Sequence, residues 1–381
     1  MSRTLPAWFS QPGLGIFVHW GPFAVPAFAP TLGPGESLPE LLRSDPRHLG
    51  ERMPYSEWYR NAMTIPGSPT ARHHREVWDD APYEDFQATF EAGLDAWDPH
   101  RWAELFAASG AGYVVLVTKH HDGYCLWPTE VRHPERQGWH STRDLVGELA
   151  EAVRAVGLRF GVYYSTGLDW SVHHEPIREL VDSPACIPTS QTYIRYIDDQ
   201  LDELVERYSP SVVWGDIGTP KGFDVAAFKQ RLLAAVPDAV INDRWDPPLP
   251  GLGRPLVRRM LNGVVAKLAP RGSDKPFLPG RHRLADFRTP EYSLPGPGFD
   301  QPWETTRGLG AGFGHNATET DDLRIDPDEL VALYRRVRAA GGNLLLNVGP
   351  RADGTITEAE TQRVRYLGAA IDQSGDAANQ R

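Results

Sequence analysis

Cysteine is scarce in this sequence of 381 residues, which contains only Cys125 and Cys186. Two cysteines cannot build a disulfide framework. Long apolar runs are also missing, since none approaches the roughly 20 residues that a membrane-spanning helix needs. The opening stretch MSRTLPAWFSQPGLG lacks the basic start and apolar core of a signal peptide. We therefore expect a cytoplasmic protein that does not bind a membrane.

Basic residues are outnumbered: 39 Lys and Arg stand against 50 Asp and Glu, and the formal net charge is -11 at pH 7. Surfaces that bind nucleic acid are usually basic, so this balance argues against a nucleic-acid partner. Aromatic residues are plentiful, with 12 Trp, 13 Tyr and 14 Phe beside 34 Pro and 36 Gly. Aromatic rings on a loop-rich chain suit a protein that stacks them on sugars, although a large aromatic core would have the same composition.

Short apolar runs recur along the chain, with helical patterns between several of them. Continuous rather than alternating runs indicate strands buried on both faces, as in a parallel sheet. Eight candidate strands that alternate with helices predict an α/β fold of the (β/α)8 TIM-like barrel class. An open doubly wound sheet is the alternative, but no strand is followed by a G-x-G-x-x-G turn. The candidate strands are residues 15–20, 113–118, 160–165, 211–216, 239–243, 284–287, 310–314 and 343–348.

Helices are expected where apolar residues recur on one face. One such stripe spans residues 145–156; Ser141 or Thr142 can cap its start, and Gly157 stands where a left-handed glycine commonly ends a helix. A second stripe spans residues 194–208. Further helices are expected at about residues 101–109, 225–235, 327–339 and 358–371.

Two stretches depart from the alternation of strands and helices. Residues 22–54 are rich in Pro and Gly and predict a long loop after the first strand. Residues 246–285 carry eight Lys and Arg against two acidic residues. This basic insertion is either a solvated, partly helical surface segment or a functional one, forming a rim over the active site or an oligomer contact. We expect both stretches to belong to a single barrel domain over residues 1–381.

Chemically active side chains gather at the predicted carboxyl ends of the strands. In a barrel these ends carry the active site. Imidazoles, carboxylates, hydroxyls, an arginine and aromatic rings therefore converge on one rim, a set that suits a polyhydroxylated ring. The residues are His19, Lys119, His120, His121, Tyr163, Tyr164, Ser165, Trp214, Asp216, Asn242, Asp243, Arg244, Glu291, Phe313, His315 and Asn347.

Three functions compete for this set of side chains. A retaining glycosidase needs two carboxyl groups about 5 to 5.5 Å apart, one as nucleophile and one as acid/base. A metal enzyme would take its ligands from among the 13 histidines. Adjacent pairs such as His120-His121, however, lack the spacing that metal-binding motifs usually show. A carbohydrate-binding protein without catalysis would need the pocket but not both carboxylates. Position alone also leaves a structural alternative, such as a helix cap for Asp216 or a solvated loop for Glu291.

Ten short segments then stand out, in order, along the chain. They are GIFVHWG (15–21), SEWY (56–59), KHHDGYCLWPTE (119–130), RDLVGEL (143–149), GLRFGVYYSTGLDW (157–170), VVWGDIG (212–218), INDRW (241–245), DFRTPEY (286–292), GLGAGFGHN (308–316) and GGNLLLNVGPRADGTI (341–356). Over essentially its whole length the sequence resembles the α-L-fucosidases of glycoside hydrolase family 29. The resemblance implies an exo-α-L-fucosidase that hydrolyses terminal α-L-fucosyl residues with retention of configuration.

The resemblance also implies a role for each matching residue. Asp216 matches the nucleophile that forms a fucosyl-enzyme intermediate, and Glu291 matches the general acid/base. Adjacent Tyr163 and Tyr164 compete for one role, because a shift of one residue would exchange them. The substrate contacts comprise the hydroxyl ligands His19, Glu57, His120 and His121, the aromatic wall Trp58, the pocket-floor Tyr163, Arg244 near the acid/base, and Phe313 beside the sugar methyl group.

The resemblance implies that the protein needs no metal and no organic cofactor. It also implies that the protein's partner is its substrate, a fucosylated oligosaccharide or glycoconjugate. Family members often carry a β-sandwich after the barrel, whereas about 33 residues follow Val348 here, so we expect that domain to be absent. The contacts that the β-sandwich makes with the site in relatives would then be missing or supplied by another subunit. A homo-oligomer is therefore one of the expected alternatives. The alternative function is a non-catalytic fucose- or carbohydrate-binding protein on the same barrel.

Overall fold

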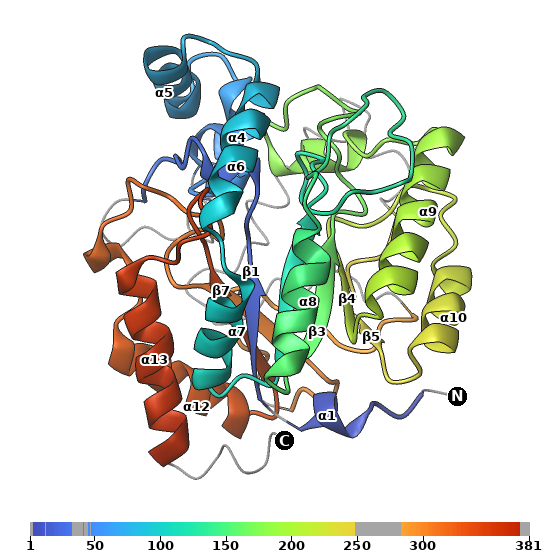
Figure 1. The fold of residues 1–381 in the computed structure, drawn as a ribbon, viewed down its shortest axis with the longest axis vertical. Helices are drawn as coiled ribbons and strands as arrows, with labels where there is room; N and C mark the ends of the chain where they lie inside the picture. The colour runs from blue at the N-terminus through green and yellow to red at the C-terminus, as the bar shows by residue number, and fades with distance from the viewer. Residues whose placement is uncertain are drawn as a thin grey trace.

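The computed structural model describes residues 3–11, 13–32, 41, 45, 47–247, 283–296 and 298–373. Within these residues the centre is a sheet of seven parallel strands in the order β5-β4-β3-β2-β1-β7-β6 (Figure 1). The predicted α/β class with a parallel sheet is confirmed. The strands are β1 (Leu14–Val18), β2 (Tyr113–Lys119), β3 (Arg159–Tyr164), β4 (Val212–Gly215), β5 (Val240–Ile241), β6 (Glu304–Gly308) and β7 (Asn343–Val348).

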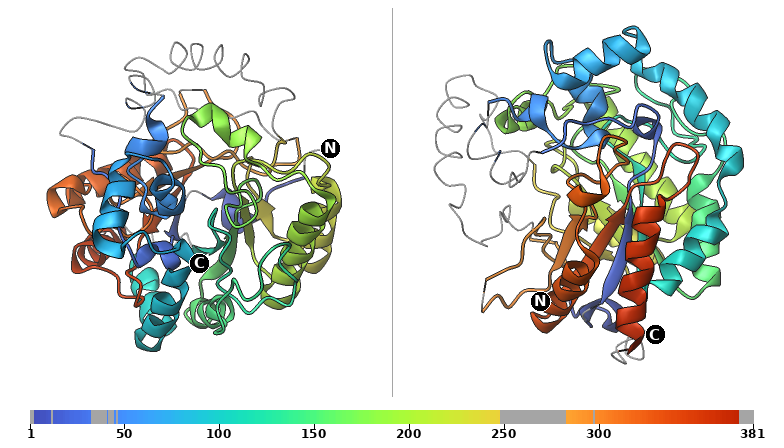
Figure 2. Two further views of the ribbon diagram at one scale, coloured as in Figure 1. Left: turned by 90° about the horizontal axis from the view of Figure 1, so that it is seen from above. Right: turned by 90° about the vertical axis from the view of Figure 1, so that its left-hand side faces the viewer.

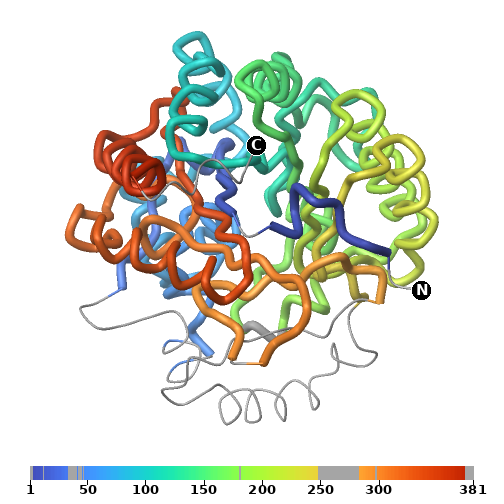
Figure 3. Tube along the Cα trace, turned by 90° about the horizontal axis from the view of Figure 1, so that it is seen from below, coloured from blue at the N-terminus to red at the C-terminus, as the bar shows by residue number. Residues whose placement is uncertain are grey.

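The sheet curls, and helices surround its outer face. Views from above and from below show the helices arranged around the strands, from the red α13 through the cyan and green helices to the yellow α10 (Figures 2 and 3). All six helices expected from the apolar stripes are present. They are α7 (Pro99–Ala108), α8 (Leu145–Ala155), α9 (Gln191–Tyr208), α10 (Val225–Ala235), α12 (Pro327–Ala339) and α13 (Glu358–Gln373).

The apolar stripes did not predict the other helices, most of which have eight residues or fewer. Helices α4, α5 and α6 lie beyond the carboxyl ends of the strands, at the top of Figure 1, while α1 lies at the opposite end. The α-helices of this group are α1 (Ala7–Ser10), α3 (Leu49–Arg52), α4 (Tyr59–Met63), α5 (Pro69–Trp78) and α6 (Phe86–Gly93). The 3-10 turns are η1 (Pro22–Ala24), η2 (Ser56–Trp58), η3 (Tyr83–Asp85), η4 (Leu94–Ala96), η5 (Leu180–Ala185) and η6 (Asp321–Leu323).

The strands are buried on both faces, which explains their continuous apolar sequences. Alternate residues of a strand point to opposite faces. On β3, Tyr163 joins the cluster inside the curled sheet, and Tyr164 joins the cluster between the sheet and the helices. The Tyr164 hydroxyl donates to Gln200 Oε1 of α9 at 2.7 Å. Of the two tyrosines that competed for the pocket, Tyr163 is therefore the one on the inner face.

Two of the predicted strands are wrong, and one strand was missed. Residues 284–287 and 310–314 are irregular, whereas the polar sequence ETTRG forms β6. Runs of Gly cannot fill the apolar layers beside a sheet, and GAGFG instead forms a loop after β6. The β6 strand escaped prediction because its inward residues Glu304 and Thr306 are polar although fully buried.

The irregular segment 286–292 links the two outer strands of the sheet. Asp286 N donates to Ile241 O at the end of β5, at 2.9 Å. On the other side, Thr306 N of β6 donates to Pro290 O at 3.0 Å, and Tyr292 N donates to Thr306 O at 2.9 Å. Hydrogen bonds therefore continue from β5 to β6 through a segment that is not itself a strand.

The two ends of α8 were predicted from the sequence, and the structure corrects one of them. The cap of α8 is Asp144, whose carboxylate accepts from Gly147 N at 2.9 Å, and neither Ser141 nor Thr142 takes that role. A carboxylate directly before the first turn reaches the free N–H groups better than a hydroxyl further upstream. The predicted Gly157 is confirmed after α8, with φ of 83°.

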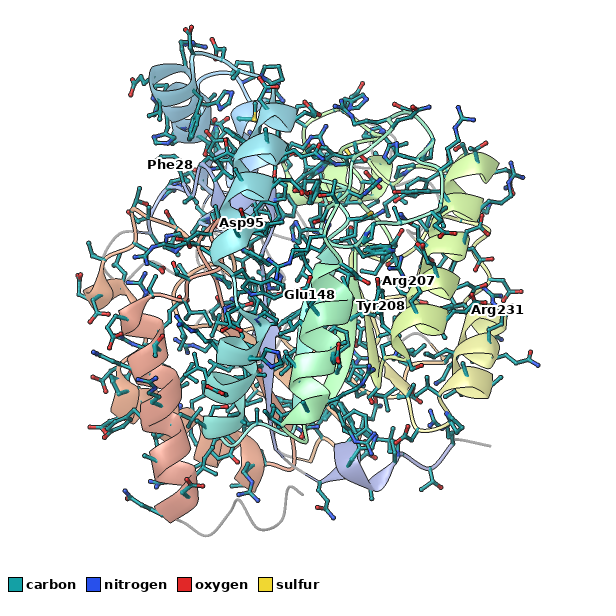
Figure 4. The ribbon with its side chains drawn as sticks, in the orientation of Figure 1. Phe28, Asp95, Glu148, Arg207, Tyr208 and Arg231 are labelled. Atoms are coloured by element: carbon teal, nitrogen blue, oxygen red, sulfur yellow. The ribbon has the colours of Figure 1, made fainter. Side chains whose placement is uncertain are left out.

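Ion pairs join neighbouring helices on the solvent side of the sheet, and two of their arginines, Arg207 and Arg231, are labelled in Figure 4. Arg207 of α9 donates to Asp144 at 2.9 Å, and Arg231 of α10 donates to Asp198 and Asp202 of α9. These side chains are 32% to 40% exposed. Exposed pairs contribute only about 0–1 kcal/mol each, so the helices depend mainly on their buried apolar faces.

The basic insertion predicted at residues 246–285 lies outside the described residues except at its ends. The predicted loop at residues 22–54 is described in part, and the described part includes the short η1 and α3. No helix among the described residues has both the length and the apolar character needed to cross a membrane.

Candidate active site

A pocket opens at the carboxyl ends of the strands, and all ten residues named from the family resemblance line it. Strand ends, the loops that follow them and the η2 turn each contribute side chains. The predicted lining residues are His19, Glu57, Trp58, His120, His121, Tyr163, Asp216, Arg244, Glu291 and Phe313. Five more complete the lining: Phe17, Tyr55, Trp214, Ile217 and Thr306.

Asp216 follows β4 directly, and each of its carboxylate oxygens accepts a hydrogen bond. Oδ1 accepts from Arg244 Nη1 and from Ile217 N, both at 2.9 Å, and Oδ2 accepts from the Tyr163 hydroxyl at 2.9 Å. Burial alone would raise the pKa of Asp216. The charge of Arg244, the neighbouring His121 and the two side-chain hydrogen bonds outweigh burial, so the pKa lies below its ordinary value. The carboxylate is therefore ionised in neutral and mildly acidic solution.

A single guanidinium connects Asp216 to a second carboxylate, Glu291. While Arg244 Nη1 bonds to Asp216, Arg244 Nη2 lies 3.1 Å from Glu291 Oε2. The other oxygen, Glu291 Oε1, accepts from the Tyr55 hydroxyl at 2.8 Å. The Glu291 side chain is 29% exposed and that of Asp216 only 11%. The two carboxylates thus share one cation but differ in access to solvent, an arrangement that allows different acid–base tasks.

The three histidines of the pocket are neutral because they are buried. Burial lowers the pKa of His19 to about 3 and that of His121 to about 4, and the pKa of His120 is also lowered well below its ordinary value. His19 Nδ1 lies 2.6 Å from Asn347 Oδ1, and His121 Nδ1 lies 2.7 Å from Ser165 Oγ. A neutral imidazole can donate or accept with its second nitrogen. Within the described ranges, no group of three or more His, Cys, Asp or Glu could hold a metal ion.

Glu57 and Trp58 come from the η2 turn and face the loop that carries Phe313. The Glu57 carboxylate accepts from Phe313 N at 3.3 Å and from Gly314 N at 2.8 Å, while burial raises its pKa to about 7. The Trp58 ring meets His121 edge-on at 5.6 Å, and Phe313 stacks on His19 at 5.0 Å. Aromatic and polar groups therefore alternate around the pocket.

Both carboxylates are followed by a non-glycine residue in the left-handed region. Ile217 has φ of 58° and Tyr292 has φ of 49°. A β-branched residue rarely adopts this conformation, and such strain persists only where the surroundings hold it. Around Ile217, Thr166 Oγ1 donates to Gly218 O at 2.6 Å, and Gly218 N donates to Arg244 O at 3.1 Å. The strained turn lets the Ile217 N–H bond the carboxylate of the residue before it.

Several residues expected at the strand ends do not line the pocket. Lys119 is fully buried with its Nζ 2.8 Å from Asp169 Oδ2, and Asn347 instead orients His19. His315 lies beyond the lining residues. The sequence analysis did not predict Tyr55 as a lining residue. Its position in YSEW, two residues before Glu57, could have indicated it. The Thr306 contribution was hidden because its strand was not recognised.

The stability of the protein is expected to depend on pH through His121. Its pKa is about 4 in the folded protein against 6.5 ordinarily, so the unfolded chain takes up the proton first as pH falls. The stabilisation present above pH 6.5 is therefore lost between pH 6.5 and about 4. Between pH 7 and pH 4.5, urea denaturation should show the wild type losing about 2 kcal/mol more unfolding free energy than His121→Gln. The exposed control His100→Gln should follow the wild type, and equal losses in all three proteins would contradict the prediction.

Carboxylates, neutral imidazoles and aromatic rings at the carboxyl edge of a curled parallel sheet are typical of a glycoside hydrolase. The sequence matches the profile of the family described as Alpha-L-fucosidase over residues 1–251 and 271–376. The chain belongs to the α-L-fucosidase family of glycoside hydrolases.

Individual relatives agree with this placement. The plasma α-L-fucosidase of Homo sapiens is 31% identical over 99% of this chain and 69% of its own, and the α-L-fucosidase of Dictyostelium discoideum is 30% identical over 96% and 70%. Among solved structures, the Thermotoga maritima α-fucosidase in complex with fucose is 35% identical, with a TM-score of 0.78 over 98% of this chain and 75% of its own. The same enzyme with a mechanism-based inhibitor is 37% identical at a TM-score of 0.78 over the same shares.

Proposed function

We propose that this protein is a retaining exo-α-L-fucosidase that releases terminal α-L-fucosyl residues by double displacement. The observation that carries the proposal is the Arg244 guanidinium, which bonds Asp216 and Glu291 at once. One guanidinium can bridge two carboxylates only if they lie close together. Retaining glycosidases hold their two carboxyl groups about 5–5.5 Å apart, whereas inverting ones leave about 6.5–9.5 Å for a water. The bridge brings the two carboxylates close together, and we assign them the shorter, retaining arrangement.

Asp216 serves as the nucleophile in this mechanism. It lies on a strand end, it is held by three hydrogen bonds, and its lowered pKa keeps it ionised. In the first step a carboxylate oxygen of Asp216 bonds to the anomeric carbon while the bond from that carbon to the leaving oxygen breaks. A rigidly held, ionised carboxylate loses little freedom on reaching the transition state.

Glu291 serves as the acid and then as the base. In the first step its proton passes to the leaving oxygen of the aglycone. In the second step the Glu291 carboxylate removes a proton from water, whose oxygen attacks the anomeric carbon and releases Asp216. The partial exposure of Glu291 suits this task, because both the leaving group and the water must reach it.

The remaining lining residues recognise the sugar. Glu57 and the neutral imidazoles of His19, His120 and His121 offer hydrogen bonds to the three hydroxyls of fucose, and His120 Nδ1 is free of protein partners among the described residues. Trp58 and Phe313 supply an apolar wall for the methyl group, and Tyr163 closes the floor. A pocket walled by buried side chains suits a terminal sugar.

The predicted eight-stranded barrel has seven strands among the described residues. We infer that the curled sheet, the helix ring and segment 286–292 together form a (β/α)8-like barrel, in which this irregular segment takes the place of one strand between β5 and β6. The hydrogen bonds of Asp286 to β5 and of Pro290 and Tyr292 to β6 support this closure. We propose on this basis a single catalytic domain over residues 1–381. The fucosylated substrate is an oligosaccharide or glycoconjugate, and self-association stays a prediction.

The test is hydrolysis of an aryl α-L-fucoside by the wild type, followed by proton NMR. We expect turnover with α-L-fucose as the first-formed product, because two displacements restore the starting configuration. First-formed β-L-fucose would overturn the retaining mechanism. Binding of fucose without turnover of any fucoside would favour the non-catalytic carbohydrate-binding protein instead.

Arg244→Met should lower kcat/KM on the same substrate about 10- to 100-fold and move the acid limb of its pH profile upward. The charge of Arg244 opposes the burial that raises the pKa of Asp216, so its loss leaves the nucleophile protonated at higher pH. Arg159→Met, which removes a surface ion pair with Asp238, is the control and should leave the profile unchanged. An unmoved acid limb in Arg244→Met would contradict the assignment of that limb to Asp216.

A further inference from the structure

A third carboxyl group lies beneath the pocket, inside the curled sheet. Glu304 begins β6 and is 0% exposed. It lies two residues before Thr306, which lines the pocket, so both side chains point inward and Glu304 sits one layer deeper. Its neighbours in this layer belong to the apolar inner cluster that includes Tyr113 and Trp214.

Glu304 is bonded by two neutral donors. The Tyr113 hydroxyl donates to Glu304 Oε2, and the indole Nε1 of Trp214 donates to Glu304 Oε1 at 3.2 Å. Burying a carboxyl group in apolar surroundings costs several kcal/mol unless it is well bonded, and an aliphatic side chain would avoid that cost. The proposed chemistry does not use Glu304 directly. Among the described residues, the Trp214 indole is the pocket-lining group whose hydrogen bond the Glu304 side chain accepts.

Trp214 in turn supports both side chains that hold the nucleophile. Its ring stacks on Tyr163 with centroids 5.6 Å apart and planes 23° apart. The guanidinium carbon of Arg244 lies 4.6 Å from the centre of the Trp214 ring. Tyr163 and Arg244 are the two side-chain donors to Asp216. Rotation of the indole would therefore disturb both donors at once.

We propose that Glu304 is a positioning residue for the nucleophile: by accepting the indole N–H of Trp214, it fixes the ring on which Tyr163 and Arg244 rest. The proposal rests on the assignment of Asp216 as nucleophile. Without an acceptor, the buried Trp214 N–H would be left unpaired, and the ring would turn to find a partner. The donors to Asp216 would then lose their alignment.

The test compares Glu304→Met with Glu304→Gln in the pH profile of kcat/KM on an aryl α-L-fucoside. Methionine preserves volume but removes the acceptor, so Asp216 loses donors and its acid limb should rise by about one pH unit, with about a tenfold loss below the limb. KM should change less than kcat. Burial raises the pKa of Glu304 to about 7, so the group is neutral across the acid limb and glutamine should restore the wild-type profile.

The matched control is Glu203→Met on the outer helix α9. Glu203 Oε2 accepts from the Trp127 indole at 2.8 Å, but neither residue lines the pocket. This variant also loses the hydrogen bonds from Thr129 and Glu130, so it should lower the melting temperature while it leaves the acid limb in place. A general loss of stability is thereby separated from a loss of alignment.

A second variant keeps the proposal testable if Glu304→Met does not fold. Trp214→Phe retains an aromatic ring, removes the N–H, and should move the acid limb by a similar amount. The two changes should not add in the double variant, because they break one interaction. Additive shifts, or an unmoved limb in the folded variants, would overturn the inference alone. A wild type that turns over no fucoside would overturn the proposed function and the inference with it.

Discussion

Asp216→Ala is expected to lower kcat on an aryl α-L-fucoside by about 10⁴-fold, the largest effect of any single substitution in the pocket. The change removes the carboxylate that bonds to the anomeric carbon in the proposed mechanism, while Arg244 keeps its bond to Glu291. Substrate binding should persist, because the imidazoles, Glu57 and the aromatic walls are untouched. The loss should therefore appear in kcat rather than in binding of fucose, which titration calorimetry can measure.

Azide should partly restore turnover by Asp216→Ala, a result that a merely misfolded variant would not give. A small anion can enter the space left by the Asp216 carboxylate and attack the anomeric carbon from the same side. One displacement inverts the configuration, so NMR should identify β-L-fucosyl azide as the product. The control Asp238→Ala, which removes a carboxylate from a surface ion pair, should keep wild-type activity. Full activity of Asp216→Ala would show that another group is the nucleophile.

Glu291→Ala is expected to have the second-largest effect, about 10²–10⁴-fold on substrates with poor leaving groups. A leaving oxygen of high pKa needs a proton as its bond breaks, whereas a dinitrophenolate does not. The loss should therefore grow with the pKa of the aglycone across a series of aryl α-L-fucosides. A loss of equal size along the whole series would place the acid elsewhere in the loops.

Azide should also rescue Glu291→Ala, but with the opposite stereochemistry. Here the fucosyl-enzyme on Asp216 still forms, and azide replaces the water that Glu291 would have activated. Two displacements retain the configuration and give α-L-fucosyl azide. Tyr55→Phe is the companion variant, because it removes only the hydrogen bond to Glu291 Oε1. Its loss should stay below about 150-fold, since one hydrogen bond to a charged group contributes about 1.5–3 kcal/mol at most.

Local sequence patterns predicted the helices that follow or precede the strands, and most of the strands, because each pattern reports a local requirement. The stripe at residues 194–208 became α9, since one apolar face must pack on the sheet. Strand β6 broke this rule. Its inward residues Glu304 and Thr306 are polar, and their burial depends on partners that come from distant parts of the chain, such as Tyr113 and Trp214. No window of sequence around β6 contains those partners.

The candidate site divides in the same way. Its ten residues could be named from the sequence, because each stands in a motif or at the end of a recognisable strand. Which of two adjacent tyrosines points inward required the register of β3, and the choice of Tyr163 over Tyr164 follows from that register alone. The contributions of Tyr55 and Thr306 likewise appear only when the strand ends are brought together.

The sequence by itself therefore determined the fold class, the family and the chemical inventory of the pocket. Tertiary structure alone decided how those groups act on one another. Arg244 and Glu291 are 47 positions apart, yet one guanidinium joins Glu291 to Asp216. Burial keeps the histidines neutral, and the charge of Arg244 keeps Asp216 ionised despite its burial. The sequence specifies which side chains are present. The distances between them and their removal from water arise only when the curled sheet brings its strand ends to one rim.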